Sequence, residues 1–198
     1  FIVSGPSITL LSAERLVLNV MQRMSAIATL TNKYVKELNG LSTKVLDTRK
    51  TTPLIRFLEK EAVKIGGGVN HRFGLYDMVM LKDNHNDFAG GIEKSINKTV
   101  QYLKENKLNL KIEVETRNID EVKEVLKIGK IDRIMLDNFT YDDMKKAVKL
   151  IDGKYETEAS GGINIKTIRK YAECGVDYVS VGALTHSVCN MDLSLKAL

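Results

Sequence analysis

Six short runs of β-branched and aliphatic residues alternate with helical patterns along this chain, and that alternation restricts the folds open to it. The runs span residues 44–47, 78–82, 110–115, 133–137, 155–159 and 178–181. Apolar residues at helical spacing predict helices over 53–65, 92–106, 119–128, 141–151 and 165–174. Pro53 fits the first turn of one helix, and Gly175 fits the end of another. Strands that alternate with helices predict an α/β fold with a parallel sheet.

The length of the chain helps to decide between a barrel and an open sheet. A longer helix is predicted over 12–38, where Leu16, Val20, Met24, Ile27 and Leu30 recur at helical spacing. A complete eight-unit barrel needs ~250 residues, whereas this chain has 198. We therefore predict an incomplete parallel (β/α) barrel of six or seven strands, preceded by the long helix. A doubly wound sheet fits less well, because it would gather its site at one switch point and use fewer strands.

Charge and composition argue against several classes of partner. The net charge is +5, from 30 Lys and Arg against 25 Asp and Glu, but the charges alternate in sign along stretches such as 59–61 and 142–146. That pattern is typical of a solvated helix face, so we expect no nucleic acid partner. No apolar run approaches the ~20 residues of a membrane span, so we expect no membrane partner. Cys174 and Cys189 lack paired spacing, which indicates a reducing compartment, and we expect the cytoplasm.

Polar residues and glycines lie at the carboxyl ends of the predicted strands, the rim on which (β/α) barrels build their active sites. These residues are Asp47, Lys82, Glu115, Asp137, Ser160 and Gly182. The stretch 46–85 has further cationic or potentially cationic donors at Arg49, Lys50, His71 and Arg72. Guanidinium groups bind carboxylates bidentately, and lysines attract phosphate oxygens as point charges. The rim therefore suits a small, highly anionic substrate.

Two successive strand-to-helix loops near the end of the chain contain glycine. Ser160-Gly161-Gly162 precedes a helix that Asn164 could cap, and Gly182 follows the next strand. Unhindered backbone N–H groups beside the positive end of a helix bind phosphate, and late loops are the usual phosphate position of barrel enzymes. The alternative interpretation is that these glycines only make tight turns.

Glu115 and Asp137 end neighbouring strands, so we expect their carboxylates to converge within a few ångströms. Such a pair could hold a divalent ion or accept hydrogen bonds from sugar hydroxyls. Glycosidases also use two carboxylates, and two strand-end caps exposed to water are the simpler alternative. Lys82 adds another alternative, because a strand-end lysine can form a Schiff base, as in barrel aldolases.

The rim residues belong to a series of motifs that resembles the quinolinate phosphoribosyltransferase family. The motifs are Leu46-Asp-Thr-Arg-Lys-Thr-Thr-Pro53, Gly66-Gly-Gly-Val-Asn-His-Arg72, Leu81-Lys-Asp-Asn-His85, Glu113-Val-Glu115, Leu136-Asp-Asn-Phe139, Ser160-Gly-Gly162 and Ser180-Val-Gly-Ala-Leu-Thr-His-Ser187. The predicted long helix adds Glu14-Arg15, and it has Ala26 where the family usually has glycine. The likeness extends from about residue 12 to the end of the chain.

The resemblance implies a domain order that this chain contains only in part. Family members begin with an α/β sandwich domain, so residues 1–11 are interpreted as its tail and 12–187 as the barrel with its leading helix. Residues 188–198 would return toward that domain, because 191–195 resembles the family's returning strand. The chain begins with Phe1 instead of Met, so we expect upstream residues to be missing from it. In the family's homodimer, the N-terminal domain of one subunit lies over the barrel mouth of the other.

The resemblance also implies an activity, nicotinate-nucleotide diphosphorylase (carboxylating), a pentosyltransferase of NAD biosynthesis. Phosphoribosyl pyrophosphate and quinolinate would give nicotinate mononucleotide, pyrophosphate and CO2. The implied catalytic residues are Lys50, Lys82, Glu115 and Asp137. Quinolinate would be bound by Arg15 of the partner subunit together with Arg49, His71, Arg72 and Lys82. Phosphoribosyl pyrophosphate would be bound by Lys50, Glu115, Asp137, Ser160, Gly161, Gly162 and Gly182. Mg²⁺ would be held by Glu115 and Asp137 through water.

Two other functions remain open on the sequence. A related phosphoribosyltransferase could act on another acceptor, in which case a mono-acid would leave one of Arg49, Arg72 or Lys82 unused. A non-catalytic phosphate-binding barrel is the alternative from a different class. Release of CO2 would exclude the first, and release of pyrophosphate would exclude the second.

Overall fold

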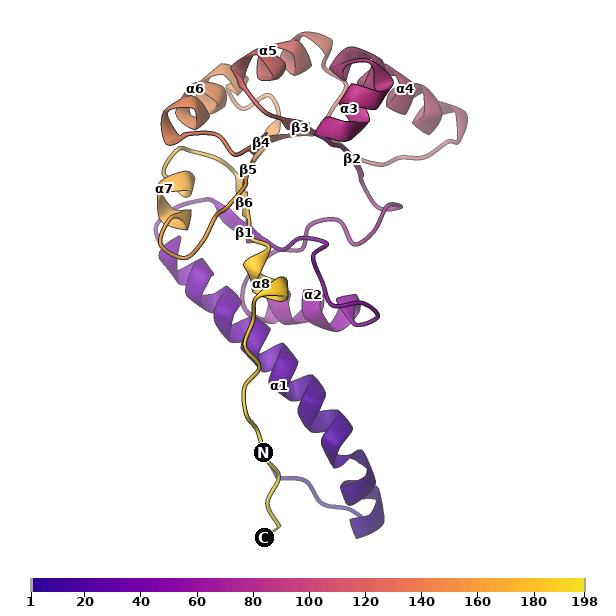
Figure 1. Ribbon diagram of the computed structural model, residues 1–198, viewed down its shortest axis with the longest axis vertical. Coiled ribbons are helices and arrows are strands. Elements are labelled where there is room, and N and C mark those ends of the chain that lie inside the picture. Colours follow the sequence, from indigo (N-terminus) through magenta and orange to yellow (C-terminus); the bar gives the residue numbers. More distant parts are fainter. Residues whose placement is uncertain (1, 198) are drawn as a thin grey trace.

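The computed structural model of the chain describes residues 2–197, so Phe1 and Leu198, the outermost residues of the two predicted flanking segments, lie outside the described part. Helices and strands alternate along the chain (Figure 1). The strands are β1 (Lys44–Leu46), β2 (Val79–Leu81), β3 (Ile112–Thr116), β4 (Arg133–Asp137), β5 (Glu156–Ser160) and β6 (Tyr178–Ser180). The helices are α1 (Ser7–Glu37), α2 (Arg56–Ile65), α3 (Asp83–Ala89), α4 (Ile92–Glu105), α5 (Ile119–Ile128), α6 (Tyr141–Ile151), α7 (Ile168–Ala172) and α8 (Ala183–His186).

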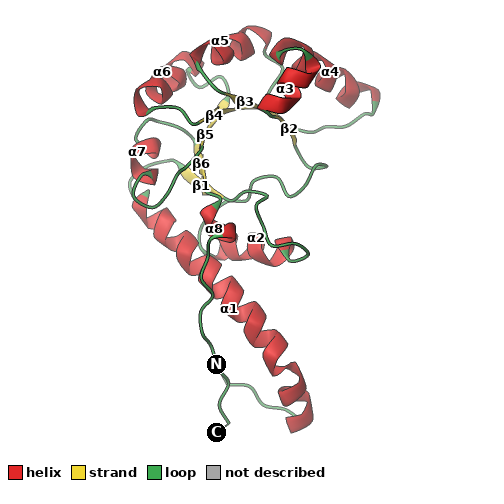
Figure 2. Ribbon diagram, in the orientation of Figure 1, coloured by secondary structure: helices red, strands yellow, loops and turns green. Residues whose placement is uncertain are grey.

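The sheet confirms the prediction of an incomplete barrel. Residues 2–197 form one six-stranded sheet in the order β1-β6-β5-β4-β3-β2, in which every neighbouring pair is parallel. β1 and β2 are consecutive in the chain but lie at opposite edges, so the barrel is open between them. A single parallel bridge from Leu46 to Val69 begins to fill the gap. Figure 2 shows the strands as an arc with the helices around its outside.

The two faces of the curved sheet differ in chemistry because side chains alternate along each strand. On the outer face, Val114, Ile134 and Val179 are fully buried and join the hydrophobic core with the surrounding helices. The inner face is polar: Glu113 and Glu158, which alternate with these apolar residues, are also fully buried. The barrel interior is therefore a layer of charged groups beneath the mouth, not the apolar filling common in complete barrels.

α1 extends beyond its predicted limits. It begins at Ser7, five residues before the predicted start, so it runs into the segment 1–11 that was interpreted as a domain tail. Pro6 immediately precedes it, and the apolar residues of that segment continue the helical pattern. Only the C-terminal part of α1 packs on the barrel, through side chains such as Ile27 and Tyr34. The N-terminal part projects away from the sheet (Figure 1).

Two other local predictions were wrong, and one helix was not predicted. Pro53 is not in a first turn, because α2 begins at Arg56 after Leu54 adopts a left-handed conformation with φ of 70°. The stretch after β2, to which no element was assigned, forms α3, which Gly90 ends with φ of 82°. The last long helix is reduced to α7, and Asn164 caps only the turn before it, accepting from the Lys166 amide at 3.0 Å.

The C-terminal segment runs back beside α1. The Met191 amide N–H donates to Gln22 O at 3.4 Å, and the Gln22 side chain donates to Leu193 O at 3.2 Å. The strand expected over 191–195 is not formed in this structure, although the direction of the segment, along the leading helix, agrees with the prediction (Figure 1). No helix of the described residues is long and apolar enough to span a bilayer.

Candidate active site

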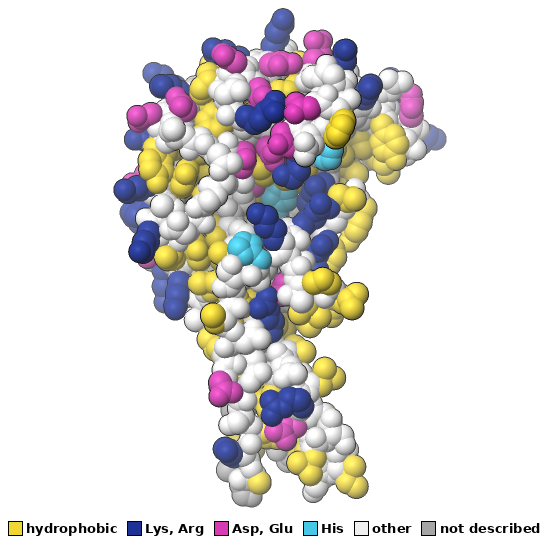
Figure 3. Space-filling model, viewed as in Figure 1, with side chains coloured by type: hydrophobic (Ala, Val, Ile, Leu, Met, Phe, Trp, Pro, Cys, Tyr) yellow, Lys and Arg dark blue, Asp and Glu magenta, His cyan; other side chains and the backbone are white. Residues whose placement is uncertain are grey.

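The carboxyl ends of the strands surround one cavity of about 820 Å³. Lys, Arg and His side chains gather around the hollow at the barrel mouth (Figure 3). Every residue for which a catalytic or binding role was predicted lines this cavity except Arg15. The predicted residues in its lining are Arg49, Lys50, His71, Arg72, Lys82, Glu115, Asp137, Ser160, Gly161, Gly162 and Gly182. The structure thus confirms that these groups converge, whereas the role of each one stays a prediction.

Arg15 is the predicted residue that the structure does not bring to the cavity. It is exposed on the projecting part of α1. The role in the site of a partner subunit stays a prediction.

Three of the cations in the cavity have no internal counter-charge. Among residues 2–197, no carboxylate lies within ion-pair distance of Arg49, Lys50 or Arg72. Burial and the nearby Arg49 guanidinium lower the pKa of Arg72, against weaker opposing effects of Glu113 and Asp77. Arg72 is buried and makes one hydrogen bond, to Met78 O, so it gains more from an incoming anion than a hydrated or paired cation would. The cavity is therefore prepared for an anionic ligand.

The fourth cation, Lys82, is already paired. Its Nζ lies 2.7 Å from Oε2 of Glu115, whose side chain is buried while that of Lys82 is half exposed. Schiff-base lysines are activated by an apolar pocket or by another cation, and Lys82 has neither arrangement. The ion pair therefore argues against an aldolase-type Schiff base at this position.

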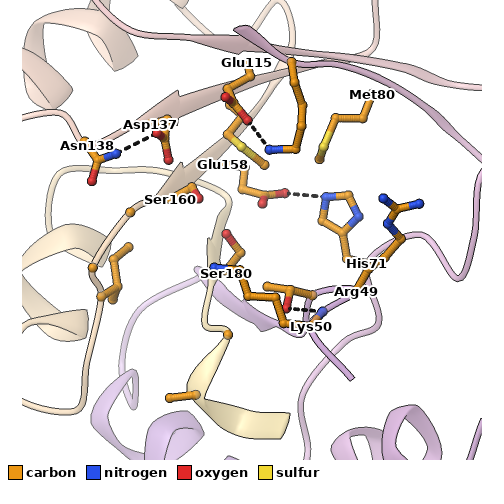
Figure 4. A pocket seen from close by; sticks show the side chains of 18 of the residues that line it. Arg49, Lys50, His71, Met80, Glu115, Asp137, Asn138, Glu158, Ser160 and Ser180 are labelled. Atoms are coloured by element: carbon orange, nitrogen blue, oxygen red, sulfur yellow. Dashed lines mark hydrogen bonds and ion pairs between the residues drawn. The ribbon is translucent and has the colours of Figure 1, made fainter. Parts of the chain in front are cut away.

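Glu115 and Asp137 face the same cavity but are not directly opposite one another. Glu115 is in register with Met135, so Asp137 lies two residues further along β4, about 7 Å in the strand direction. Asp137 accepts from the Asn138 side chain at 2.6 Å (Figure 4). The expected close approach is replaced by a diagonal arrangement across the mouth, which leaves room for a ligand between the two carboxylates.

The glycine loop after β5 is shaped by contact with its neighbour. Gly161 has φ of 100°, and a Cβ there would collide with the Asn138 side chain. Gly162, with φ of 59°, has open space beside it, so its backbone is accessible from the cavity. The helix predicted to follow this loop begins later than expected, because α7 is short and starts only at Ile168. Any phosphate here would depend on backbone N–H groups of the loop itself.

His71 lies at the floor of the cavity against two buried carboxylates. Its Nε2 is 2.9 Å from Glu113 Oε2. It is also 3.3 Å from Glu158 Oε2, the contact drawn in Figure 4. Arg133 in turn binds Glu158 at 3.1 Å from below. Burial alone would lower the pKa of His71, but the two carboxylates overcome this effect and raise that pKa to about 9. Burial beside Glu158 raises the pKa of Glu113 to about 7, whereas His71 and Arg133 outweigh burial and keep that of Glu158 below its usual range.

The other ring nitrogen of His71 opposes this protonation. The Arg72 amide N–H donates to Nδ1 at 2.7 Å, which requires a bare Nδ1 and therefore the neutral tautomer with its proton on Nε2. The carboxylates favour a charged ring and the amide a neutral one. Glu158 is ionised and Glu113 is partly ionised at neutral pH, and in a medium of low dielectric their charge outweighs one amide contact, so we take the charged ring as the dominant form.

We expect Glu158→Gln to lower the pKa of His71 from about 9 toward its ordinary 6.5, because it removes one of the two carboxylates. The ring nitrogens can be followed by ¹⁵N NMR against pH, and the chain has only 3 His to assign. Glu156→Gln is the matched control, because Glu156 also binds Arg133 but does not contact His71. A ring that stays neutral at pH 7 in the unmodified protein would show that the Arg72 amide dominates.

The same titration predicts a change in stability. The pKa of His71 is higher in the folded chain than in the unfolded chain, so the charged ring stabilises the fold fully below pH about 6.5. This contribution is lost as the pH rises through about 9.

The loop that supplies His71 is held by a buried ion pair below the rim. Lys60 Nζ lies 2.6 Å from Asp47 Oδ1 and also donates to His71 O at 3.0 Å. Asp47 Oδ1 accepts from the His71 amide at 2.8 Å. Burial raises the pKa of Asp47 and lowers that of Lys60, in each case against the partner's charge. Asp47, which was expected on the rim, is thus a support for His71 and not part of the cavity lining.

Several lining residues were not identified from the sequence. They include Thr48, Asn138, Glu158, Ser180 and His186. The polar alternation of β5 could have revealed Glu158, because it lies two residues before Ser160 and therefore on the same face of the strand. His186 belongs to the motif over 180–187, and it borders the cavity although no binding role was predicted for it.

Comparison with known proteins identifies the family. The profile described as "Quinolinate phosphoribosyl transferase, C-terminal domain" matches residues 27–196. The chain is 48% identical over 208 residues to "Quinolinate phosphoribosyltransferase [decarboxylating] 2, mitochondrial" of Nicotiana glauca, covering 98% of this chain and 59% of that protein. The chain belongs to the quinolinate phosphoribosyltransferase family.

Relatives from bacteria agree within the same family. The "Probable nicotinate-nucleotide pyrophosphorylase [carboxylating]" of Bacillus subtilis is 45% identical, over 96% of this chain and 65% of that protein. The crystal structure of NadC from Streptococcus pyogenes superposes with a TM-score of 0.91 at 42% identity, over 98% of this chain and 66% of that one. The described fold is therefore that of the family's C-terminal domain, and this chain spans about three fifths of the length of its plant relatives.

Proposed function

We propose that the complete protein transfers the ribose 5-phosphate group of phosphoribosyl pyrophosphate to the ring nitrogen of quinolinate, with loss of CO2. The main support is the cavity itself, where Arg49, Lys50 and Arg72 lack counter-charges while Glu115 and Asp137 lie across the mouth. Such a site accepts a compact ligand with several negative charges beside a group bearing hydroxyls. The names of the relatives describe phosphoribosyl transfer to quinolinate and formation of a nicotinate nucleotide.

The residues suit the charge changes of this transfer. As the bond from C1 of the ribose to pyrophosphate breaks, its electron pair leaves with pyrophosphate, and positive charge grows on the sugar. Lys50 would stabilise the leaving group, and the carboxylates of Glu115 and Asp137 would bind the ribose hydroxyls and oppose the growing positive charge. The loop Ser160–Gly162 and Gly182 would hold the 5-phosphate through backbone N–H groups.

Quinolinate has two carboxylates, which explains the excess of unpaired cations. Arg49 and Arg72 each offer a fork of donors that matches one carboxylate, and the charged ring of His71 adds a third contact. After the new N–C1 bond forms, the ring is a pyridinium. It accepts the electron pair of the carbon–carbon bond that breaks when CO2 leaves, and a proton from water then replaces the lost carboxylate. The protein therefore needs to position and neutralise charge, without a dedicated base.

Mg²⁺ fits the carboxylates of the mouth. Two diagonal oxygen ligands, Glu115 and Asp137, suit a hard cation that keeps several waters and binds substrate phosphates. Among residues 2–197, His71, Glu113 and Glu158 form the one cluster of three potential metal ligands, but Arg133 already pairs with Glu158 there. When bound at the mouth, the ion would neutralise charge on the pyrophosphate.

The experiment that tests this proposal measures products with the full-length protein. Quinolinate and phosphoribosyl pyrophosphate should give equal amounts of pyrophosphate and CO2, and nicotinate in place of quinolinate should give neither at a comparable rate. Pyrophosphate release with nicotinate would favour a transferase for a mono-acid acceptor. Saturable binding of phosphoribosyl pyrophosphate without any release would favour a non-catalytic barrel.

A homodimer that shares Arg15 is part of the proposal. Arg15 is exposed on the projecting part of α1, where Leu11 and Leu16 are also 71% exposed. This end of α1 carries exposed apolar and cationic side chains and lies away from the cavity of its own chain. Such a surface suits contact with a second subunit.

Mixing two inactive variants, Arg15→Ala and Lys50→Ala, should therefore restore about one quarter of the activity of the unmodified protein. Half of the randomly formed dimers contain one of each subunit, and in those dimers one of the two sites receives an intact Lys50 and an intact Arg15. The measurement is pyrophosphate release after mixing and reassembly of the full-length proteins. If Arg15 served its own subunit, no mixture of the two variants would recover activity.

We propose a cytoplasmic location because the two free cysteines, Cys174 and Cys189, suit a reducing compartment. A relative from Nicotiana glauca is named as mitochondrial, so fractionation of cells with an antibody to this protein is the required test.

A further inference from the structure

The segment Arg49-Lys50-Thr51-Thr52 supplies two of the three unpaired cations, yet it belongs to no helix or strand. Two of its backbone groups are held by side chains from elsewhere in the chain. Thr185 Oγ1 donates to Lys50 O at 2.7 Å, and the Thr52 amide N–H donates to Glu59 Oε2 at 3.0 Å. The placement of the cations therefore depends on α8, which supplies Thr185, and on α2, which supplies Glu59.

A third side chain, Arg23 of α1, joins these two contacts. Its Nε donates to Glu59 Oε1 at 2.9 Å, and its Nη2 donates to Thr185 O at 2.5 Å. Glu59 and Thr185 are fully buried, and the side chain of Arg23 is 18% exposed. We name Arg23, Glu59 and Thr185 the clamp. α1, α2 and α8, which supply it, lie together beside β1 (Figure 1).

None of the three clamp residues lines the cavity. They are still close to it, because Lys50 lies directly against the Gly182 loop: a Cβ added to Gly182 would come 3.2 Å from Lys50 Cδ. A shift of the segment would therefore move Lys50 relative to the loop that is expected to hold phosphate. A buried carboxylate and a buried hydroxyl aimed at backbone groups of one short segment define its position more strictly than packing alone.

We propose that Arg23, Glu59 and Thr185 are positioning residues for the reaction, and that they act by fixing the backbone of residues 49–52 so that Lys50 faces the leaving pyrophosphate. This inference rests on the proposed function for the role of Lys50. Sequence motifs gave no indication of it, because the three residues come from three separate helices and act through backbone groups.

The test compares two substitutions of buried threonines in the full-length protein. Thr185→Val removes the hydroxyl that binds Lys50 O while keeping the shape of the side chain. Thr43→Val is the matched control, because Thr43 is buried and its Oγ1 also donates to a carbonyl, Val176 O, at 2.7 Å, but at the opposite end of β1. Both variants should lose about 2–4 °C of Tm, as expected for one buried hydrogen bond in a chain of this size.

The two variants should differ in kinetics. Thr185→Val should lower kcat by about tenfold to a hundredfold, because a misplaced catalytic group is costly even at shifts near 1 Å. Its dissociation constant for quinolinate should rise by a smaller factor than kcat falls, since Arg49 lies on the segment but Arg72 and His71 lie on a different loop. Thr43→Val should keep both constants, and Thr185→Ser, which restores the hydroxyl, should recover kcat. Equal kcat values for Thr185→Val and Thr43→Val would overturn the proposal.

Hydrogen exchange separates failure of this inference from failure of the proposed function. The Thr52 amide should exchange at least about tenfold faster in Thr185→Val than in Thr43→Val, whether or not the protein has the proposed activity. If the unmodified protein releases no pyrophosphate, the proposed function fails, and the role of the clamp in the reaction fails with it. If activity is present but exchange at Thr52 is the same in both variants, the clamp does not fix the segment.

Discussion

Lys60→Met is expected to lower the free energy of unfolding by about 3–5 kcal/mol, because it leaves a buried carboxylate without its counter-charge. Lys60 and Asp47 are 2% and 0% exposed, and their charged atoms lie 2.6 Å apart. Methionine has nearly the same length and volume, so the loss would come from charge and not from a cavity. The substitution also removes the donor to His71 O, so the floor of the cavity should loosen together with the fold.

The effect of Lys60→Met should depend on pH. Burial raises the pKa of Asp47 in the folded chain, and Lys60 is the main group that opposes this. Without Lys60, the folded pKa rises further above the unfolded value of about 4, so the carboxylate destabilises the fold increasingly as the pH rises from about 4 through the folded pKa. The deficit in stability should therefore be larger at pH 8 than at pH 5.

The control for this prediction lies on the same helix. Lys64 pairs with Glu61 at the surface, where both side chains are about half exposed (53% and 52%). Lys64→Met should change the free energy of unfolding by less than about 0.5 kcal/mol. The free energies of unfolding of the unmodified protein, Lys60→Met and Lys64→Met are measured by urea unfolding at pH 5 and pH 8. The m-value checks that the transition stays two-state. Equal losses for both variants would mean that the buried pair contributes no more than a surface pair.

The barrel and most of its rim could be predicted from the sequence because both depend on local signals. Most strands are short runs in which aliphatic residues are continuous or alternate with polar ones, and the chemically active residue lies at the strand end, as Glu115 and Asp137 do. Parallel strands place their carboxyl ends at one edge, so a list of strand ends is nearly a list of cavity residues. The prediction that these groups share one mouth followed from topology, before any side chain was placed.

The remaining features depend on contacts between distant parts of the chain. Nothing local to Glu59 or Thr185 indicates that they meet at residues 49–52, and nothing local to Glu158 shows that it faces His71. The start of α1 and the late start of α2 were missed for a related reason. Pro53 favours a first helical turn by its own conformation, but the Thr52 amide is bound by Glu59 and Leu54 turns left-handed, so the helix is delayed to Arg56.

Arg72→Ala is expected to weaken quinolinate binding by about a hundredfold or more in the full-length protein. A charge-assisted contact to a carboxylate in a desolvated site is worth roughly 2–5 kcal/mol when one partner is removed. Arg72 is 9% exposed, and its Nη1 donates to Met78 O at 3.1 Å, which fixes the guanidinium at the cavity wall. The affinity for phosphoribosyl pyrophosphate should change less than about threefold, since Lys50 and the glycine loops are untouched.

Two further variants make the result on Arg72 specific. Arg117→Ala removes another arginine just past the end of β3, but Arg117 already binds Asp87 and Glu121 and does not line the cavity, so both affinities should be unchanged. Arg72→Lys keeps the charge and loses the fork, so it should fall between Arg72→Ala and the unmodified protein. Calorimetry with each substrate alone measures the two affinities in every variant. Equal losses for the two substrates in Arg72→Ala would mean that Arg72 supports the cavity as a whole, and the assignment of this side of the mouth to the diacid would be wrong.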